Sequence, residues 1–459
     1  MLYKLSTFPI TIFSLFLFLS PFSYSQENAN YSKELEPFVT LISEANAIQK
    51  KKAIRTINRQ WKSSYGIMVL ETFYFSNNSE LRLELLTLLQ DKTRRNFGYD
   101  SRRWYKWFWN NKYTPHKDYH TFKAFLHKKI DSRFERYFLD RQDDATIRFD
   151  EIVWGGVLQD GIPPLRNPRM ISAERADYLD DGNIVFGIEI NGDYRAYPKR
   201  ILAWHELFTD TVGGVPVAGV YCTLCGTVVL YKSEHKGVQY QLGTSGFLYR
   251  SNKLMYDQKT QSLWNTLWGK PVVGPLVGKG IELEYLSVVT TTWGQWKQRH
   301  PETTVLSLRT GHRRNYDEGE AYKDYFSTDK LMFDVPKVNR KLKNKQSILA
   351  IRFPETSEQP LAISVKFLRK NPIYEDQIGN RKFVVFTDET GANRVYERKD
   401  KQFVDYDQNK TATDANDKRW TLYEDRLEDN EGNTLNRINT FNAFWFGWKA
   451  AYPDTRLVK

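Results

Sequence analysis

The two cysteines of the chain, Cys222 and Cys225, lie in the run VYCTLCGT at residues 220–227. A C-x-x-C spacing brings two sulfurs close enough to form a small-loop disulfide or to hold one soft metal ion. Three hypotheses follow. The pair cycles between dithiol and disulfide, with one activated and one resolving cysteine; it binds Zn or Cu with ligands from elsewhere; or it is an inert structural disulfide.

His205 precedes the cysteines in the run AWHELFTDTVGG, residues 203–214. His205 and Glu206 begin like the zinc-protease motif H-E-x-x-H, but Thr209 stands where the second histidine would be, so that motif is excluded. His205 is a candidate third metal ligand or a base that activates a thiol. A single histidine beside a tryptophan is more often structural, and both interpretations stay open.

Met255 adds a thioether to this set, in the run LGTSGFLYRSNKLMYDQ at residues 242–258. Cysteine, histidine and methionine together suit Cu(I). The metal hypothesis therefore takes Cys222, Cys225, His205 and Met255 as ligands of Cu or Zn. Met255 also fits an ordinary core position.

The elements that position these residues are expected to be short strands. After residue 145 the chain consists of β-like runs separated by Gly, Pro, Asn and Asp, which predicts a mainly antiparallel sheet structure. Residues 226–231 favour a strand directly after Cys225, whereas a thioredoxin-like site needs a helix there. With the helical N-terminal part described below, the predicted fold class is α+β.

The β-rich part also contains an internal repeat. Three segments of a first repeat (145–330) are similar, in the same order, to three of a second repeat (340–459). The pairs are 183–202 with 346–368, 215–233 with 381–399, and 293–307 with 444–458. Thr387 and Thr390 replace the cysteines in the second copy, so any thiol chemistry belongs to the first repeat.

Residues 26–140 are predicted to form a helical domain, because apolar residues recur there at helical spacing. The chain carries 67 Lys and Arg against 55 Asp and Glu, a net charge of +12, and this domain holds much of the surplus. Its run RRWYKWFWNNK (102–112) interleaves basic and aromatic residues, a pattern that can bind single strands or glycans. Trp104 and Trp107 share a helix face, which favours burial against the next domain instead.

The first 25 residues have the pattern of a secretory signal peptide: Lys4, an apolar run over 8–19, and small residues Ser23 and Ser25 before Gln26. We therefore expect an exported protein, periplasmic or secreted, with no transmembrane segment after cleavage. Export favours oxidising conditions around the thiols.

Residues 195–231, with TSGFLYRSNKLMYDQKTQSLWNTLWG (244–269) and WGQWKQRHPETTVLS (293–307), resemble the bacterial and archaeal family called domain of unknown function 3179. The resemblance extends over about 145–459 and implies an established fold unit without an established activity. The family usually has Tyr-Cys-Pro-Leu-Cys, where this chain has Thr223 in place of proline. The resemblance also implies selenocysteine in this motif in some relatives, which favours redox chemistry.

The resemblance implies a larger site around the cysteines. Its residues, taken as cofactor-binding or catalytic positions, are Asp160, His205, Glu206, Asp210, Cys222, Cys225, Ser245, Met255, Tyr256 and Asp257.

Three functions remain as hypotheses. The first is a thiol-dependent oxidoreductase using Cys222, Cys225 and His205, with an unknown redox partner. The second is a protein that binds Cu or Zn through the same residues. The third is a non-catalytic module that binds a glycan or protein of the cell envelope through Trp-rich basic surfaces. Nucleic acid is not an expected partner, because no nucleic-acid module is recognisable.

Overall fold

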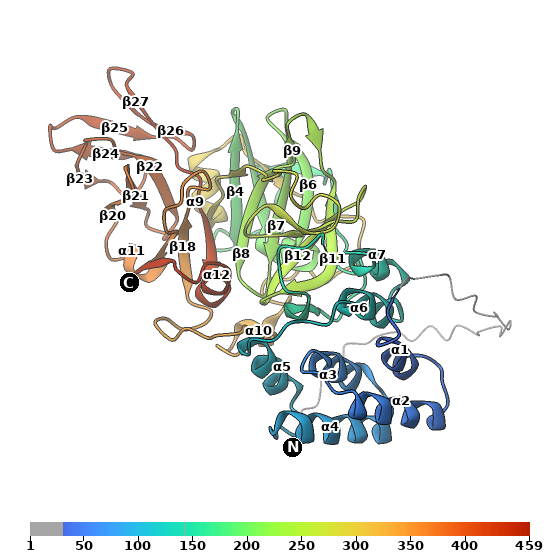
Figure 1. Cartoon of the computed structure of the whole chain (residues 1–459). Coiled ribbons are helices and arrows are strands. Elements are labelled where there is room, and N and C mark those ends of the chain that lie inside the picture. Colours follow the sequence, from blue (N-terminus) through green and yellow to red (C-terminus); the bar gives the residue numbers. More distant parts are fainter. Residues whose placement is uncertain (1–30, 142) are drawn as a thin grey trace.

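Helices form the first part of the described chain, and strands with a few short helices form the rest (Figure 1). The structure is a computed structural model that describes residues 31–141 and 143–459. The predicted signal peptide, residues 1–25, lies outside the described residues. The α+β fold class predicted from the sequence is confirmed.

Seven α-helices build the N-terminal part around α3 (Tyr65–Phe75), which is buried along most of its length. Its all-round apolar character explains this central position, because a helix that is apolar on every side needs neighbours on every side. The other elements are α1 (Glu36–Ile42), α2 (Ala47–Arg59), α4 (Ser79–Thr93), α5 (Ser101–Asn110), α6 (Tyr119–Lys128), η1 (Ser132–Phe134) and α7 (Glu135–Phe138).

Helix α5 carries the Trp-rich run, and its tryptophans have different environments. Trp104 is fully buried inside the helical domain, where its ring packs on Phe97. Trp107 is only partly buried. Trp109 reaches the next domain, since its indole N–H donates to the backbone oxygen of Asp150 at 2.8 Å. The contact with the β-rich part that the sequence suggested for Trp104 and Trp107 is thus made by Trp109.

The first repeat contains three sheets of five strands and a two-stranded ribbon. Its strands are β1 (Ile152–Trp154), β2 (Leu165–Arg166), β3 (Met170–Ser172), β4 (Ile184–Ile190), β5 (Asp193–Pro198), β6 (Leu207–Val212), β7 (Val215–Cys222), β8 (Thr227–Lys232), β9 (Glu234–His235), β10 (Val238–Gln239), β11 (Leu242–Tyr249), β12 (Asn252–Asp257), β13 (Leu263–Asn265), β14 (Lys270–Val273), β15 (Tyr285–Leu286), β16 (Val289–Thr292) and β17 (Thr304–Leu306). Its helices are η2 (Phe149–Glu151), η3 (Ala173–Arg175), α8 (Lys199–His205) and α9 (Trp293–Arg299).

The second repeat contains sheets of four, three and five strands. Its elements are β18 (Ser347–Ile351), β19 (Leu361–Ser364), α11 (Val365–Leu368), β20 (Ile373–Ile378), β21 (Arg381–Thr387), β22 (Asn393–Glu397), β23 (Phe403–Tyr406), β24 (Thr411–Asp414), β25 (Arg419–Leu422), β26 (Arg426–Asp429), β27 (Thr434–Asn436), β28 (Phe441–Phe444), α12 (Trp445–Ala451) and β29 (Arg456–Val458).

The two repeats share one strand order. The order β16-β4-β5-β17 of the first repeat has its counterpart in β28-β18-β19-β29 of the second, and the hairpin set β6-β7-β8 matches β20-β21-β22. The last strand of each four-strand set pairs in parallel, β17 with β5 and β29 with β19. The indole N–H of Trp296 donates to the Thr303 hydroxyl at 2.9 Å, and the indole N–H of the equivalent Trp448 donates to the Thr455 hydroxyl at 2.9 Å. The duplication inferred from sequence is therefore present in the topology.

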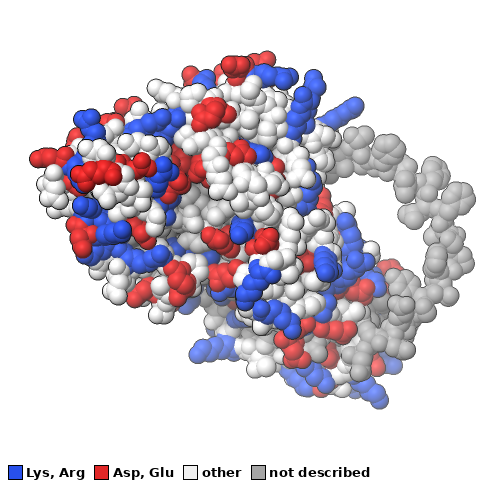
Figure 2. Space-filling view, turned by 90° about the horizontal axis from the view of Figure 1, so that it is seen from above, with Lys and Arg blue, Asp and Glu red and all other residues white. Residues whose placement is uncertain are grey.

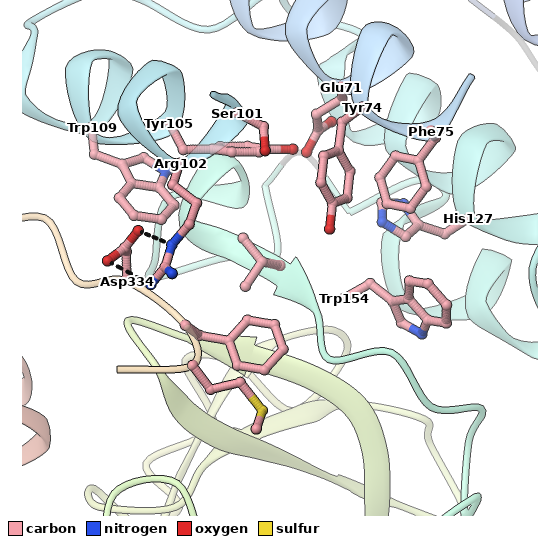
Figure 3. A pocket seen from close by; sticks show the side chains of 13 residues that line it. Glu71, Tyr74, Phe75, Ser101, Arg102, Tyr105, Trp109, His127, Trp154 and Asp334 are labelled. Atoms are coloured by element: carbon pink, nitrogen blue, oxygen red, sulfur yellow. Dashed lines mark hydrogen bonds and ion pairs between the residues drawn. The ribbon is translucent and has the colours of Figure 1, made fainter. Parts of the chain in front are cut away.

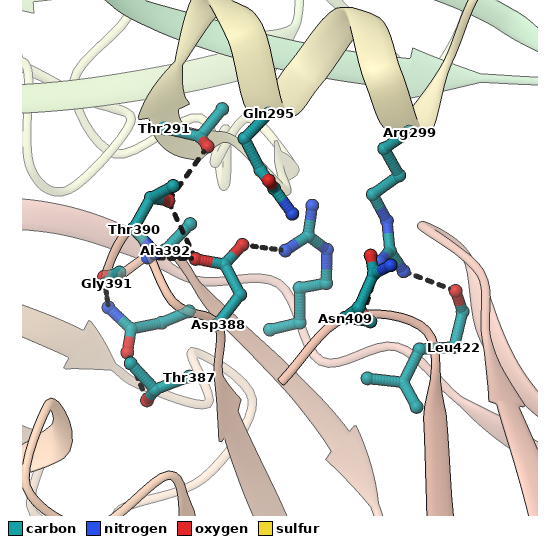
Figure 4. Close-up of polar contacts among 12 residues, drawn as sticks. Thr291, Gln295, Arg299, Thr387, Asp388, Thr390, Gly391, Ala392, Asn409 and Leu422 are labelled. Atoms are coloured by element: carbon teal, nitrogen blue, oxygen red, sulfur yellow. Dashed lines mark hydrogen bonds and ion pairs between the residues drawn. The ribbon is translucent and has the colours of Figure 1, made fainter. Parts of the chain in front are cut away.

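Each repeat packs its β-turn loop against the helix region of the other repeat. In the first loop, the Cys225 carbonyl accepts from the backbone N–H of Phe444, beside α12, at 2.8 Å. In the second loop, the Thr390 hydroxyl lies 3.3 Å from that of Thr291, just before α9 (Figure 4). The contacts are reciprocal.

A linker of mostly irregular structure, residues 308–346, joins the repeats and contains only the short helix α10 (Lys323–Phe326). It runs back toward the helical domain, where Asp334 pairs with Arg102 and Lys106. The linker therefore bridges the three parts of the described chain.

Charges of both signs are intermixed on the face seen from above (Figure 2). None of the helices within residues 31–141 and 143–459 is long and apolar enough to cross a membrane.

Candidate functional site

Cys222 ends strand β7, and Cys225 lies in the turn that leads into β8. The turn is closed by pairing of Cys222 with Thr227, and Gly226 adopts the left-handed conformation that the turn needs, with φ of 55°. Strand β8 confirms the prediction of a strand, and not a helix, after the second cysteine. Both thiols are free, and the Cys225 thiol donates to the carbonyl oxygen of Cys222 at 3.8 Å.

The two sulfurs are buried, with residue exposures of 1% for Cys222 and 0% for Cys225. On one side Gly447 of α12 approaches so closely that a Cβ there would lie 2.7 Å from Cβ of Cys225. Because glycine has no Cβ, Cys225 can approach helix α12 this closely. The helix of the second repeat is thus part of the wall of the cysteine site.

A buried ion pair lies beside the cysteines. Glu206 caps the C-terminus of α8 with a φ of 56°, and its carboxylate pairs with the ammonium group of Lys253 on β12. The Thr223 hydroxyl, from between the cysteines, donates to Glu206 at 2.5 Å, and the Tyr322 hydroxyl of the linker donates at 3.1 Å. The carboxylate therefore connects the C-x-x-C turn, a strand and the linker.

The environment divides the two thiols. Burial, and to a smaller extent the charge of Glu206, act to raise the pKa of Cys222. A hydrogen bond with the Cys225 side chain and the charge and backbone N–H of Lys253 act to lower it. The lowering effects are larger, so the pKa of Cys222 lies below the ordinary value. Burial and the neighbouring Cys222 raise the pKa of Cys225 well above the ordinary value. This division suits one thiolate and one thiol that share a proton.

The linker covers this turn from outside. The Tyr325 hydroxyl donates to the carbonyl oxygen of Leu224 at 2.6 Å. Tyr325 and Val335 belong to the same buried apolar cluster as the cysteines, with Leu248 and Phe446. A molecule reaching the sulfurs from this side has to displace the linker.

His205 makes its own hydrogen bonds and does not join the cysteines. Its Nδ1–H donates to the carbonyl oxygen of Pro163 at 2.8 Å, and Nε2 accepts from the Tyr316 hydroxyl at 2.6 Å. Burial lowers the pKa of His205 to about 4, so the ring is neutral at pH 7. With both ring nitrogens engaged, His205 has no free position to bind a metal or to accept a proton from a thiol.

The residues proposed as Cu or Zn ligands do not form a donor set. Met255 belongs to a different apolar cluster, where it lies opposite Trp264 in the neighbouring strand, and His205 is engaged elsewhere. Across the described ranges, no group of three or more His, Cys, Asp or Glu side chains is arranged to hold a metal ion. Two sulfurs alone do not satisfy the four-coordinate preference of zinc.

Asp160 and Tyr256 are brought together, away from the cysteine turn. The Tyr256 hydroxyl donates to Asp160, whose other oxygen accepts from the backbone N–H of Thr244 at 3.0 Å. Burial and this carboxylate raise the pKa of Tyr256 to about 12. The pair fixes the segment around 160 against strand β11.

The remaining predicted positions each have a local structural partner. Asp210 accepts from Arg195 at 2.8 Å and from Tyr197 at 2.6 Å. Asp257 closes a turn by accepting from the backbone N–H of Thr260 at 2.7 Å. The Ser245 hydroxyl donates to the carbonyl oxygen of Leu254 at 2.6 Å, at the irregularity between β11 and β12.

The predicted site thus separates into one cluster with the cysteines and several distinct ones. Of the positions implied by the resemblance, Glu206 lies at the cysteine turn. The roles of all these positions remain predictions. Lys253, Tyr322 and Tyr325 are additional residues that sequence reasoning did not select. The one available signal was Lys253 itself, a charged residue directly before the apolar pair Leu254 and Met255 in β12.

Comparison with known proteins gives one positive result. A family model described as protein of unknown function (DUF3179) matches residues 159–455. The chain belongs to the DUF3179 family. The matched range covers both repeats and leaves the helical domain outside it. Searches of curated proteins and of solved structures find no match.

The DUF3179 match places the cysteine turn, Glu206 and Lys253 in the family region, together with the linker and helix α12. The aromatic run of α5 lies before the match. The cysteine turn therefore lies within the matched family region, and the helical domain lies outside it.

Proposed function

We propose that this DUF3179 protein is a thiol–disulfide oxidoreductase, with Cys222 as the attacking residue and Cys225 as the resolving residue. One observation carries the proposal: two free thiols share a turn beside a buried Lys253–Glu206 ion pair. The positive charge of Lys253 lowers the pKa of the Cys222 thiol and so favours its thiolate, which is the reactive form. The division of the two thiol pKa values agrees with these roles.

The proposed reaction is exchange with an external organic disulfide. The Cys222 thiolate attacks one sulfur of the substrate, the substrate S–S bond breaks, and one substrate thiolate leaves. Cys225 then attacks the Cys222 sulfur, and the second substrate thiolate leaves with the proton that Cys225 loses. The substrate gains two electrons and becomes one thiol and one thiolate, which takes its proton from water, while Cys222 and Cys225 become a disulfide.

Access to the sulfurs is part of this proposal. Because Tyr325 and Val335 of the linker cover the turn, reaction requires local opening of residues 322–335. This part of the linker has mostly irregular structure, and displacing such a segment costs less free energy than displacing a strand. Small disulfides therefore react more readily than large folded ones.

The test compares two matched variants with an aromatic disulfide reagent and mass spectrometry. Cys225→Ser is expected to trap a stable mixed disulfide on Cys222, because no resolving thiol remains. Cys222→Ser is expected to react slowly, since the pKa of Cys225 is high. Equal trapping in both variants contradicts the assignment. A wild-type Cys222–Cys225 disulfide that is reduced only at potentials below about −300 mV in dithiothreitol buffers would identify a structural bridge.

Export is a further part of the proposed function. It is supported by the N-terminal sequence pattern alone, whose residues lie outside the described ranges. A periplasmic or secreted location supplies substrates that contain disulfides.

A further inference from the structure

A cavity of about 260 Å³ lies where the helical domain, strand β1 and the linker meet (Figure 3). No residue of the cysteine turn lines it. Its lining residues come from α3, α5, α6, β1 and the linker, and five of them are Tyr74, Phe75, Tyr105, Trp109 and Trp154. Aromatic faces from separate elements therefore surround one small space.

The two tryptophans present only their ring surfaces to this cavity. The indole N–H of Trp109 donates to the Asp150 carbonyl at 2.8 Å, and that of Trp154 donates to the Val157 carbonyl at 2.7 Å. Each ring thus has its polar atom satisfied. What remains for a ligand is an apolar, electron-rich face.

Polar acceptors without donors lie at the helical side of the same cavity. Glu71 is 1% exposed; its Oε1 accepts from Lys123 at 2.7 Å, but Oε2 has no hydrogen-bond partner in the described chain. The hydroxyl of Tyr119 is close to this carboxylate, yet it too lacks a partner within hydrogen-bonding geometry. A buried carboxylate oxygen without a donor is costly, so a ligand that donates to it gains affinity.

His127 supplies a second acceptor. Its Nδ1–H donates to the Lys123 carbonyl at 2.8 Å, and burial lowers its pKa well below the ordinary value, so the ring is neutral. The Nε2 lone pair of this neutral ring is therefore left as an acceptor. Both acceptors call for a ligand with hydroxyl or amide donors.

The charges of the cavity balance. Glu71 is paired with Lys123, and Arg102 is paired with Asp334 at 2.7 Å. An organic cation would need an unpaired negative charge beside the aromatic rings to be strongly preferred. A neutral ligand with apolar C–H faces and several hydroxyl donors fits these walls better.

We infer that this cavity binds a single sugar ring, as the terminal unit of a glycan. Its volume lies below the ~300–1,000 Å³ of pockets for drug-sized ligands, which limits the occupant to about one ring. The ring faces pack on the aromatic walls, and hydroxyl groups donate to Oε2 of Glu71 and Nε2 of His127. This inference is independent of the thiol chemistry.

The experiment is isothermal titration of the full mature protein with methyl glucoside, N-acetylglucosamine and, as a cationic probe, choline. We expect at least one sugar to bind with a Kd of ~1 mM, and choline to bind more weakly. The absence of binding by both sugars at ~50 mM overturns the inference. Tighter binding of choline than of either sugar also overturns it, in favour of a cation site.

Variants locate the bound sugar. Tyr74 is 48% exposed, so Tyr74→Ala removes one wall with little risk to folding, and it is expected to weaken binding by roughly fivefold. Tyr99→Ala is the matched control, since Tyr99 is 56% exposed in the same domain and does not line the cavity. His127→Phe keeps a ring but removes the acceptor and is also expected to weaken binding. Equal loss in Tyr99→Ala, or unchanged affinity in both cavity variants, contradicts this location.

Discussion

Lys253 and Glu206 form an ion pair in which both side chains are more than nine-tenths buried, with exposures of 8% and 5%. The two charges act on the Cys222 thiol in opposite directions, because Lys253 lowers its pKa and Glu206 raises it. Replacing each residue separately should therefore shift the pKa of the Cys222 thiol in opposite directions.

Lys253→Met is expected to raise the pKa of Cys222, and Glu206→Gln to lower it further. Lys253→Met also leaves Glu206 buried without its partner, which should cost about 3–5 kcal/mol of the free energy of unfolding. Iodoacetamide labelling across pH gives the thiol pKa, and urea denaturation gives the stability. Shifts of the Cys222 pKa in the same direction in both variants would contradict the proposed electrostatics.

His205 should influence stability at acidic pH and not the thiols. Its pKa of about 4 in the folded chain is below the ~6.5 of an unfolded histidine, so its neutral form stabilises the native state above pH 6.5. That contribution is lost as pH falls from about 6.5 to 4, and amounts to about 2 kcal/mol after screening by solvent.

His205→Gln should flatten this part of the stability profile while leaving the labelling pKa of Cys222 unchanged. The difference in stability between variant and wild type isolates the contribution of His205 from those of His120, His127 and His300. Burial lowers the pKa values of these three histidines as well. A raised thiol pKa in His205→Gln would support the role in thiol activation predicted from the sequence.

Tyr325 controls how often the cysteines become accessible, if linker opening limits their reaction. Tyr325→Phe removes the hydrogen bond to Leu224 and is expected to speed alkylation by roughly 2- to 10-fold, the equivalent of about 0.5–1.5 kcal/mol. Tyr231→Phe is the control, because the Tyr231 hydroxyl donates to the Thr266 carbonyl at 2.5 Å and lies outside the linker. Equal acceleration in both variants would indicate general destabilisation.

Gly447→Ala should disturb the cysteine turn from the second repeat. The new Cβ meets Cys225 at 2.7 Å, and relieving this overlap should cost about 1–3 kcal/mol of stability. Gly182→Ala is the control, because a Cβ there meets nothing within 4 Å. Denaturation midpoints and thiol labelling check both; an unchanged labelling rate in Gly447→Ala would show that α12 does not support the turn.

The export proposal predicts a mature N-terminus near Gln26. Intact-mass measurement of protein from the periplasm or medium of an expressing cell should show loss of about the first 25 residues, as for a cleaved signal peptide. Soluble exported protein that still carries Met1 would contradict cleavage.

The local patterns of the sequence were sufficient for the turn and the repeat. Strand β8 after Cys225 followed from the run 226–231, and the matching strand orders followed from three similar segments. Both depend on residues close in sequence or on an internal comparison. Such signals do not require knowledge of how distant segments pack.

The contents of the site depended on long-range packing and were less predictable. Lys253 meets Glu206 across 47 positions, and Tyr322 comes from a linker with almost no regular structure. His205 is adjacent to Glu206 in sequence, but at the end of α8 the two side chains take different partners, Tyr316 for one and Lys253 for the other. Spacing along the chain therefore did not show that Glu206, and not His205, lies at the cysteine turn.

The reciprocal packing of loop on helix has the form of an isologous interface, in which two identical subunits make the same contact twice. When the two units are fused into one chain, the two halves of such an interface can carry different residues. One loop carries free thiols against Gly447, while its counterpart carries Asp388, which pairs with the buried Arg394 at 3.1 Å. A homodimer would have to place the same residues at both positions. In the fused chain one half carries two buried thiols and the other a buried ion pair, and each loop packs against the other half.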